Sequence, residues 1–186
     1  MSSDSFEDGG VKMLIHNIFL IGFMGSGKST VAACFGKKYA MNIVEMDEAI
    51  AEKEGRSIPK IFAEDGEEYF RNLETGFLEE LKKRNNQIIS CGGGVVLRKE
   101  NISVMKESGK VVLLTASPEE ILKRVKNDEG RPLLKGRKNV EAITELLEER
   151  RMKYEMAADI VVKTDGKTAD EICEEIMKEI ERAKER

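Results

Sequence analysis

A nine-residue run beginning at Gly22, G-F-M-G-S-G-K-S-T, limits the possible folds of this chain more than any other feature. It fits the pattern G-x-x-x-x-G-K-[ST], in which glycines let the backbone curl until successive N–H groups point at phosphate oxygens. Residues 17–21 before it read as a buried strand, and the residues after it, through Tyr39, read as a helix. This order places phosphate at a helix N-terminus, where the peptide dipoles favour negative charge.

The loop also supplies two side chains suited to phosphate and its metal. We expect the Lys28 ammonium to reach the β- and γ-phosphates of a nucleotide and the Ser29 hydroxyl to ligate Mg²⁺. The residues predicted to bind the nucleotide phosphates are Gly25, Ser26, Gly27, Lys28, Ser29 and Thr30.

Length and charge restrict the class of protein. A chain of 186 residues, 40% hydrophobic and 35% charged, fits one domain, which we place at residues 13–186 after a disordered extension at 1–12. The net charge of −4 does not favour nucleic acid or an anionic membrane. We therefore expect small-molecule ligands, and a monomer, because the sequence has no obvious apolar surface stripe.

The cysteines and the N-terminal residues indicate a cytoplasmic protein. Cys34, Cys91 and Cys173 are odd in number and lack metal-ligand spacing, so we expect reduced thiols. The single histidine, His16, argues against a histidine-based metal site or triad. The first ten residues are polar and acidic, unlike a signal peptide, and no apolar run approaches membrane-spanning length.

Strand-like and helix-like segments alternate, which predicts a three-layer αβα fold with a five-stranded parallel sheet. Ser117 and Thr168 each begin a helix-capping sequence, and Ser57 predicts another short helix. Most strand candidates are short apolar runs without alternation, as expected for strands buried on both faces. They are residues 17–21, 42–45, 87–90, 111–115 and 160–162.

Two segments interrupt the alternation. Residues 49–84 are predicted to form a long helical insert between the second and third strands. Residues 127–139 are polar and basic and contain glycine and proline. In a phosphate-binding protein this composition predicts a mobile lid, and a plain surface loop would look the same.

A phosphate loop does not by itself identify the reaction. A GTPase switch protein needs D-x-x-G and N-K-x-D elements, and neither occurs in the chain. An ATP-driven motor usually ends an apolar strand in an acidic pair, whereas two candidate strands here end at Ser90 and Thr115. A small-molecule kinase needs a phosphate cradle, Mg²⁺, a lid and an acceptor pocket, and five further features fit that description.

These features lie where an acceptor pocket is expected. Acidic residues follow the second strand, at the sheet edge where open α/β folds bind ligands. An arginine and a glutamate three residues apart share a helix face. Consecutive glycines follow the third strand, and two more arginines lie in the predicted lid and in the helix after it. The residues are Glu45 and Asp47; Arg71 and Glu74; Gly92, Gly93 and Gly94; Arg131; and Arg150.

Together these segments resemble the shikimate kinase family, P-loop enzymes of the nucleoside-monophosphate-kinase-like group. The matching text is G-F-M-G-S-G-K-S-T, E-M-D-E-A-I, G-R-S-I-P-K-I-F-A-E-D-G-E-E-Y-F-R-N-L-E, S-C-G-G-G-V-V, R-P-L-L and R-R-M-K-Y, in order over residues 17–180. The stretch from Phe62 to Glu74 discriminates most, because nucleotide-accepting kinases of this group differ there.

The resemblance implies phosphoryl transfer from ATP to the 3-hydroxyl of shikimate, giving shikimate 3-phosphate and ADP, a step of aromatic amino acid biosynthesis. It places acceptor binding in residues 47–84 and assigns Asp47 to the shikimate hydroxyls and to proton acceptance. Arg71 and Arg150 would bind the carboxylate, and Glu74 would orient Arg71. The glycines Gly92, Gly93 and Gly94 would line the same pocket.

For the nucleotide, the resemblance implies that Arg131 closes with the lid over the phosphates. Arg124 would lie against the adenine, and the segment at Thr164 and Asp165 would form the other side of the adenine slot.

One residue departs from the family pattern. The family usually has Asp-x-Asp after the second strand, whereas this chain has Glu45-Met46-Asp47. Glutamate keeps the charge and reaches one methylene further, so we expect Glu45 to support Mg²⁺ through water, beside Ser29.

Two other functions stay open on the sequence. A kinase for another polyol acid, such as gluconate, would also bind a carboxylate and hydroxyls. A non-enzymatic nucleotide-binding module would be expected to lose Asp47, Arg71 or Arg131 before the P-loop, and all three are present.

Overall fold

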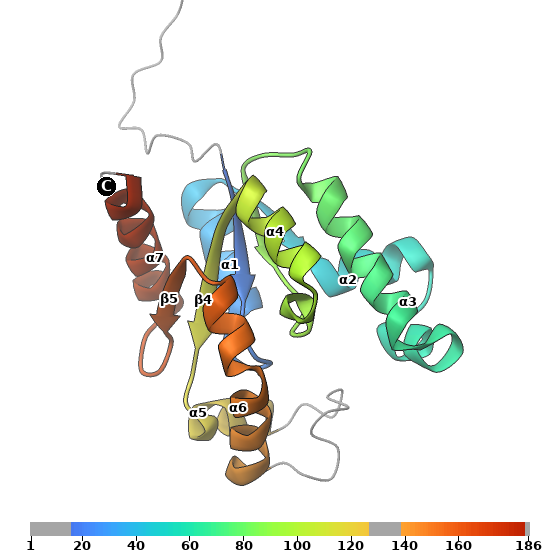
Figure 1. Cartoon of the computed structure of the whole chain (residues 1–186). Helices are drawn as coiled ribbons and strands as arrows, with labels where there is room; N and C mark the ends of the chain where they lie inside the picture. Colours follow the sequence, from blue (N-terminus) through green and yellow to red (C-terminus); the bar gives the residue numbers. More distant parts are fainter. Residues whose placement is uncertain (1–15, 127–138, 185–186) are drawn as a thin grey trace, which may run out of the picture.

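A five-stranded parallel sheet in the order β2-β3-β1-β4-β5 forms the centre of the structure, a computed structural model that describes residues 16–126 and 139–184 (Figure 1). The strands are β1 (Asn17–Ile21), β2 (Asn42–Glu45), β3 (Gln87–Ser90), β4 (Gly109–Thr115) and β5 (Ile160–Lys163). Every neighbouring pair is parallel, as predicted. Two bounds differ from the prediction, because β4 begins at Gly109 and β5 ends at Lys163.

Helices cover both faces of this sheet. They are α1 (Lys28–Tyr39), α2 (Met46–Glu54), α3 (Ile58–Leu81), α4 (Lys99–Ser108), α5 (Pro118–Val125), α6 (Val140–Ala157) and α7 (Ala169–Lys184), with a short 3-10 helix, η1 (Val95–Leu97). Two hydrogen bonds to side chains at helix starts confirm predicted caps, because the Glu120 N–H donates to Ser117 Oγ and the Glu171 N–H to Thr168 Oγ1.

Alternate residues of β1 point to opposite faces, so each face carries its own hydrophobic core. Ile18 and Leu20 pack with side chains of α1 and α7. Phe19 and Ile21 pack on the other face with side chains of α3, α4 and α6. Figure 1 shows these helices on the two sides of the sheet, which confirms the three-layer αβα class.

Burial of the strands follows their place in the sheet. β1 and β3 are buried throughout, as predicted. The expectation is wrong for β2, where Ile43 is 48% exposed, and for β5, where Val161 is 56% exposed. Both strands are at edges of the sheet, where no further strand covers their outer side.

The predicted helical insert at residues 49–84 is two helices. α2 starts earlier, at Met46, and ends at Glu54, before the capping residue Gly55, which has a left-handed φ of 64°. α3 follows from Ile58, so the helix predicted after Ser57 is long rather than short. It bends at Gly66, whose φ of 83° and ψ of 175° are not helical. Glycine tolerates these angles, which explains both interruptions.

Two predicted segments lie outside the described residues. The N-terminal extension at 1–12 is one, and the lid at 127–139 is the other, apart from Asn139, whose Oδ1 accepts a hydrogen bond from the Ala142 N–H at the start of α6.

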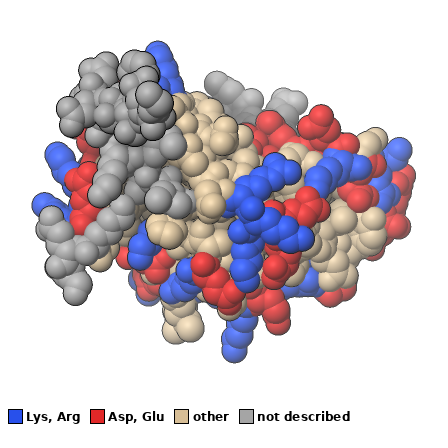
Figure 2. All heavy atoms as spheres, turned by 90° about the horizontal axis from the view of Figure 1, so that it is seen from above, with Lys and Arg blue, Asp and Glu red and all other residues tan. Residues whose placement is uncertain are grey.

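The surface mixes charges of both signs. On the face shown in Figure 2, acidic and basic side chains are interspersed rather than separated into large patches of one sign. Within residues 16–126 and 139–184, no helix has the length and hydropathy needed to cross a membrane. The three cysteines are free thiols, with Cys91 and Cys173 buried.

Asn17 ties the start of β1 to two neighbouring segments. Its buried amide Nδ2 donates to the Arg84 carbonyl at 2.9 Å, and its Oδ1 accepts from the Gln87 N–H at 3.1 Å. Asn17→Ala leaves both backbone groups without this partner, so we predict a loss of about 2 kcal/mol in the free energy of unfolding, measured by urea denaturation. Asn42→Ala, at an exposed strand end, is the control and should change stability by less than about 0.5 kcal/mol. Equal effects of the two substitutions would contradict the role of Asn17.

Candidate active site

The phosphate loop lies between β1 and α1 at the carboxyl edge of the sheet. Gly25 and Gly27 have φ angles of 74° and 99°, in the left-handed region that glycine adopts at little cost. Gly27 caps the N-terminus of α1, and Lys28, Ser29 and Thr30 form its first turn. The predicted phosphate-binding residues therefore follow one another around the helix end, where backbone N–H groups and the helix dipole favour an anion.

The Lys28 ammonium folds back over this loop. Its Nζ donates to the Gly22 carbonyl at 2.8 Å and to the Phe23 carbonyl at 3.1 Å. These contacts hold the positive charge at the mouth of the loop.

The two predicted metal residues are in direct contact. The Ser29 Oγ donates to Glu45 Oε2 at 3.0 Å and lies 3.4 Å from the Ser90 Oγ. Glu45 is the last residue of β2 and Ser90 the last residue of β3, so three adjacent elements supply these groups. Hydroxyl and carboxylate oxygens are ligands of the type that Mg²⁺ prefers, and the arrangement fits that ion.

The glycines after β3 form the meeting point of the acceptor residues; we call residues 92–94 the glycine loop. A Cβ on Gly92 would lie 2.6 Å from Asp47 Oδ1 and 3.1 Å from Glu74 Oε1. A Cβ on Gly94 would lie 2.3 Å from Arg71 Nη1. Side chains of α2 and α3 therefore occupy space that any other residue would fill.

Arg71 and Glu74 form a buried ion pair. Arg71 Nη1 lies 2.5 Å from Glu74 Oε2, and the two side chains are 12% and 0% exposed. Arg71 also donates from Nη2 to Glu67 Oε1 at 2.9 Å. Burial raises the pKa of Glu74 and outweighs the opposing effect of Arg71. The prediction of a shared helix face is confirmed, and the alternative of a solvent-exposed pair does not fit this burial.

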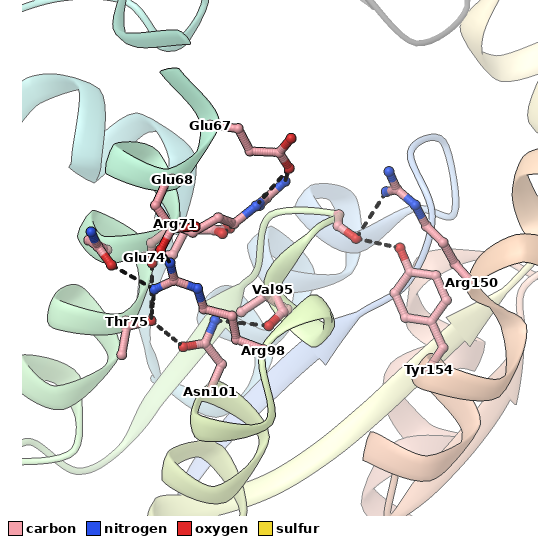
Figure 3. Close-up of polar contacts among 12 residues, drawn as sticks. Glu67, Glu68, Arg71, Glu74, Thr75, Val95, Arg98, Asn101, Arg150 and Tyr154 are labelled. Carbon is pink, nitrogen blue, oxygen red and sulfur yellow. Dashed lines mark hydrogen bonds and ion pairs between the residues drawn. The ribbon is translucent and has the colours of Figure 1, made fainter. Parts of the chain in front are cut away.

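Arg150 reaches the glycine loop from the opposite side, from α6 (Figure 3). Its Nη1 donates to the Gly93 carbonyl at 3.4 Å, and the Tyr154 hydroxyl donates to the same oxygen at 2.6 Å. Burial raises the pKa of Tyr154, so its hydroxyl stays a donor. Tyr154 ends the R-R-M-K-Y segment that begins at Arg150, one helical turn earlier, and this spacing is the sequence signal for its position.

Arg124 joins the two sides of the predicted adenine slot. Its Nη1 donates to the Gly25 carbonyl at 3.1 Å and to Thr164 Oγ1 at 3.0 Å. The neighbouring Asp165 accepts the Ser117 N–H at 3.0 Å. Burial opposes ionisation of Asp165, but the hydrogen bonds from Ser117 prevail and hold its pKa below the usual value.

The structure thus brings together the predicted acceptor residues and places the predicted phosphate residues beside them. Arg131 lies outside the described residues, so its predicted position over the phosphates is not described. Three polar residues lie behind the glycine loop and belong to no sequence motif that would have predicted them: Thr75, Arg98 and Asn101.

This phosphate loop at the carboxyl edge of a parallel sheet, next to a glycine loop that Arg71 and Arg150 approach from two sides, defines the class of P-loop small-molecule kinases. Within that class, a family model for shikimate kinase matches residues 24–181. The chain belongs to the shikimate kinase family.

Individual relatives agree with this assignment. A shikimate kinase of Dehalococcoides mccartyi is 44% identical over 87% of this chain and 91% of its own length. The structure of shikimate kinase from Acinetobacter baumannii in complex with shikimate superimposes with a TM-score of 0.86 at 32% identity, over 94% of this chain and 97% of the other. A gluconokinase from Sinorhizobium meliloti has a TM-score of 0.57 at 17% identity, over 92% and 95% of the two chains, and shares the fold.

The buried pair makes stability depend on Arg71. Arg71→Met leaves Glu74 buried beside Asp47, so we predict a loss of about 3 kcal/mol in the free energy of unfolding at pH 7.5. The double variant Arg71→Met/Glu74→Gln should recover most of it. The pKa of Glu74 is already raised and rises further without Arg71, so the folded variant takes up a proton more readily than the unfolded chain.

The loss in free energy of unfolding that Arg71→Met causes should therefore shrink as the pH falls from about 7.5 to 5.5. The reason is that protonation of Glu74 favours the folded state of the variant. Urea denaturation over this pH series measures it. A deficit that is constant with pH, or that remains in the double variant, would contradict an unpaired Glu74 as its cause.

Proposed function

We propose that this protein transfers the γ-phosphoryl group of ATP to the 3-hydroxyl of shikimate. The observation that carries the proposal is the convergence of Asp47, Arg71 and Arg150 on one glycine loop, next to the end of the phosphate loop. Family membership supports the same reaction.

The charges of this pocket suit an anionic polyol. Two guanidinium groups approach the glycine loop from α3 and α6, and each offers planar paired donors that match a carboxylate. Asp47 lies beside Gly92 on the α2 side and supplies an acceptor for hydroxyl groups. Shikimate carries one carboxylate and three hydroxyl groups, so this distribution orients it with the hydroxyls toward Asp47.

Transfer then depends on alignment and on charge neutralisation. Asp47 accepts the proton of the attacking hydroxyl, and Lys28 stabilises the charge on the transferred group. Arg131 is proposed to add a second positive charge from the lid. Mg²⁺, held by Ser29 and through water by Glu45, would neutralise the phosphate oxygens.

A panel of acceptors tests the proposal. ADP release should depend on shikimate, and quinate should give a lower kcat/KM. Gluconate and nucleoside monophosphates should be at least about a hundredfold lower in kcat/KM, because a charged site rejects acceptors that leave its groups unpaired. A preference for gluconate would favour the alternative polyol-acid kinase. ATP binding without acceptor-dependent turnover would favour a non-enzymatic module.

Glu45 gives a prediction that is specific to this chain. Its contact with Ser29 Oγ at 3.0 Å places a carboxylate where it can hold the water shell of Mg²⁺. Glu45→Gln removes the charge at nearly constant shape, so the Mg²⁺ concentration for half-maximal activity should rise by about fivefold or more. Glu45→Asp, the usual family residue, should stay within a few-fold. An unchanged Mg²⁺ dependence of Glu45→Gln would show that Glu45 is structural.

A further inference from the structure

Asn101 at the start of α4 is a polar side chain without exposure to solvent behind the acceptor pocket. Its Nδ2 donates to the Val95 carbonyl, the first residue after the glycine loop, at 2.9 Å. Its Oδ1 accepts from the Thr75 Oγ1 of α3 at 2.7 Å. Both ends of the amide are therefore used, and Asn101 bridges the segment that carries the glycine loop to the helix that carries Arg71 (Figure 3).

Thr75 is the α3 end of this bridge. Its hydroxyl has one proton, and the short contact to Asn101 Oδ1 takes it in preference to the Arg71 carbonyl, which lies 3.0 Å away. The hydroxyl oxygen remains free to accept, and Arg98 Nη1 approaches it at 3.4 Å. Thr75 thus connects α3 to two residues that follow the glycine loop.

Arg98 contacts two further residues of α3. Its Nη1 donates to Asn72 Oδ1 at 2.8 Å, and its Nη2 pairs with Glu68. Glu68, Asn72 and Thr75 lie at spacings of four and three residues and so share one face of α3. Glu67, Arg71 and Glu74 lie on the adjacent face, which points to the pocket.

Two faces of one helix therefore make different contacts. The face with Arg71 and Glu74 lies against the glycine loop, and the face with Thr75 is joined to Asn101 and Arg98. The Arg71 guanidinium lies directly against Gly94, in the space that a Cβ would occupy. Movement of α3 relative to η1 and α4 would shift Arg71 out of this place.

We propose that the Thr75–Asn101 bridge, with Arg98, is a positioning device for the acceptor carboxylate: it fixes α3 against the glycine loop so that Arg71 is held where it binds substrate. The bridge reaches the pocket through the Arg71 carbonyl, beside Thr75, and through Val95, which follows the glycine loop. This inference rests on the proposed function, because its readout is the binding of shikimate.

Thr75→Val and Thr75→Ser are the matched test variants, since the first removes the hydroxyl at nearly constant shape and the second keeps it. Thr75→Val should raise the KM for shikimate about fivefold, the factor expected for one lost hydrogen bond, and leave the KM for ATP within about twofold. Thr75→Ser should restore the KM for shikimate to within about twofold of the parent chain.

Ser108→Ala is the control for a merely structural effect. Ser108 Oγ donates to the carbonyl four residues earlier at 2.7 Å, at the far end of α4 from Asn101. It should leave the KM for shikimate unchanged. In an Arg71→Lys background, Thr75→Val should raise the KM for shikimate by less than about twofold, because its effect acts through Arg71.

Equal increases of both KM values in Thr75→Val, failure of Thr75→Ser to restore the KM, or full additivity with Arg71→Lys would each overturn the inference. If the parent chain turns over shikimate and Thr75→Val has an unchanged KM, the inference alone fails. If the parent chain does not turn over shikimate, the proposed function fails and the inference with it.

Discussion

The acceptor side of this site depends on the absence of side chains at residues 92–94. A Cβ at Gly92 or Gly94 would overlap Asp47 or Arg71, so a carboxylate and a guanidinium pack directly against backbone. Arg150 and Tyr154 reach the Gly93 carbonyl from the other side. Charged groups from α2, α3 and α6 can meet at one place because residues 92–94 between them carry no side chains.

The order of the strands brings this loop to the phosphates. β3 lies between β2 and β1, so the ends of these three strands are neighbours at one edge of the sheet. Glu45 and Ser90 are the last residues of β2 and β3, and the phosphate loop follows β1. The Ser29 hydroxyl contacts both Glu45 and Ser90. The proposed metal residues therefore connect the nucleotide side of the site to the acceptor side.

The sequence predicted those parts of the structure that local chemistry determines. The phosphate loop follows from glycine spacing, the Arg71–Glu74 pair from helix periodicity, and the parallel sheet from alternation of strands and helices. The exposed faces of β2 and β5 were missed, because burial of a strand depends on its position in the sheet. The hydrogen bonds of Asn101 were missed for a similar reason, since Thr75 is 26 residues away along the chain.

Calorimetric titration of shikimate into Gly94→Ala tests the central claim most directly. Gly94 has φ −97° and ψ 1°, angles that type I turns impose on residues of most types, so this substitution adds a methyl group and little backbone strain. The methyl group displaces the flexible end of Arg71, so the Kd for shikimate should weaken by at least about tenfold while the Kd for ADP is unchanged. Gly76→Ala on α3, where a Cβ meets nothing within 4 Å, is the control. Unchanged shikimate binding by Gly94→Ala would contradict the account.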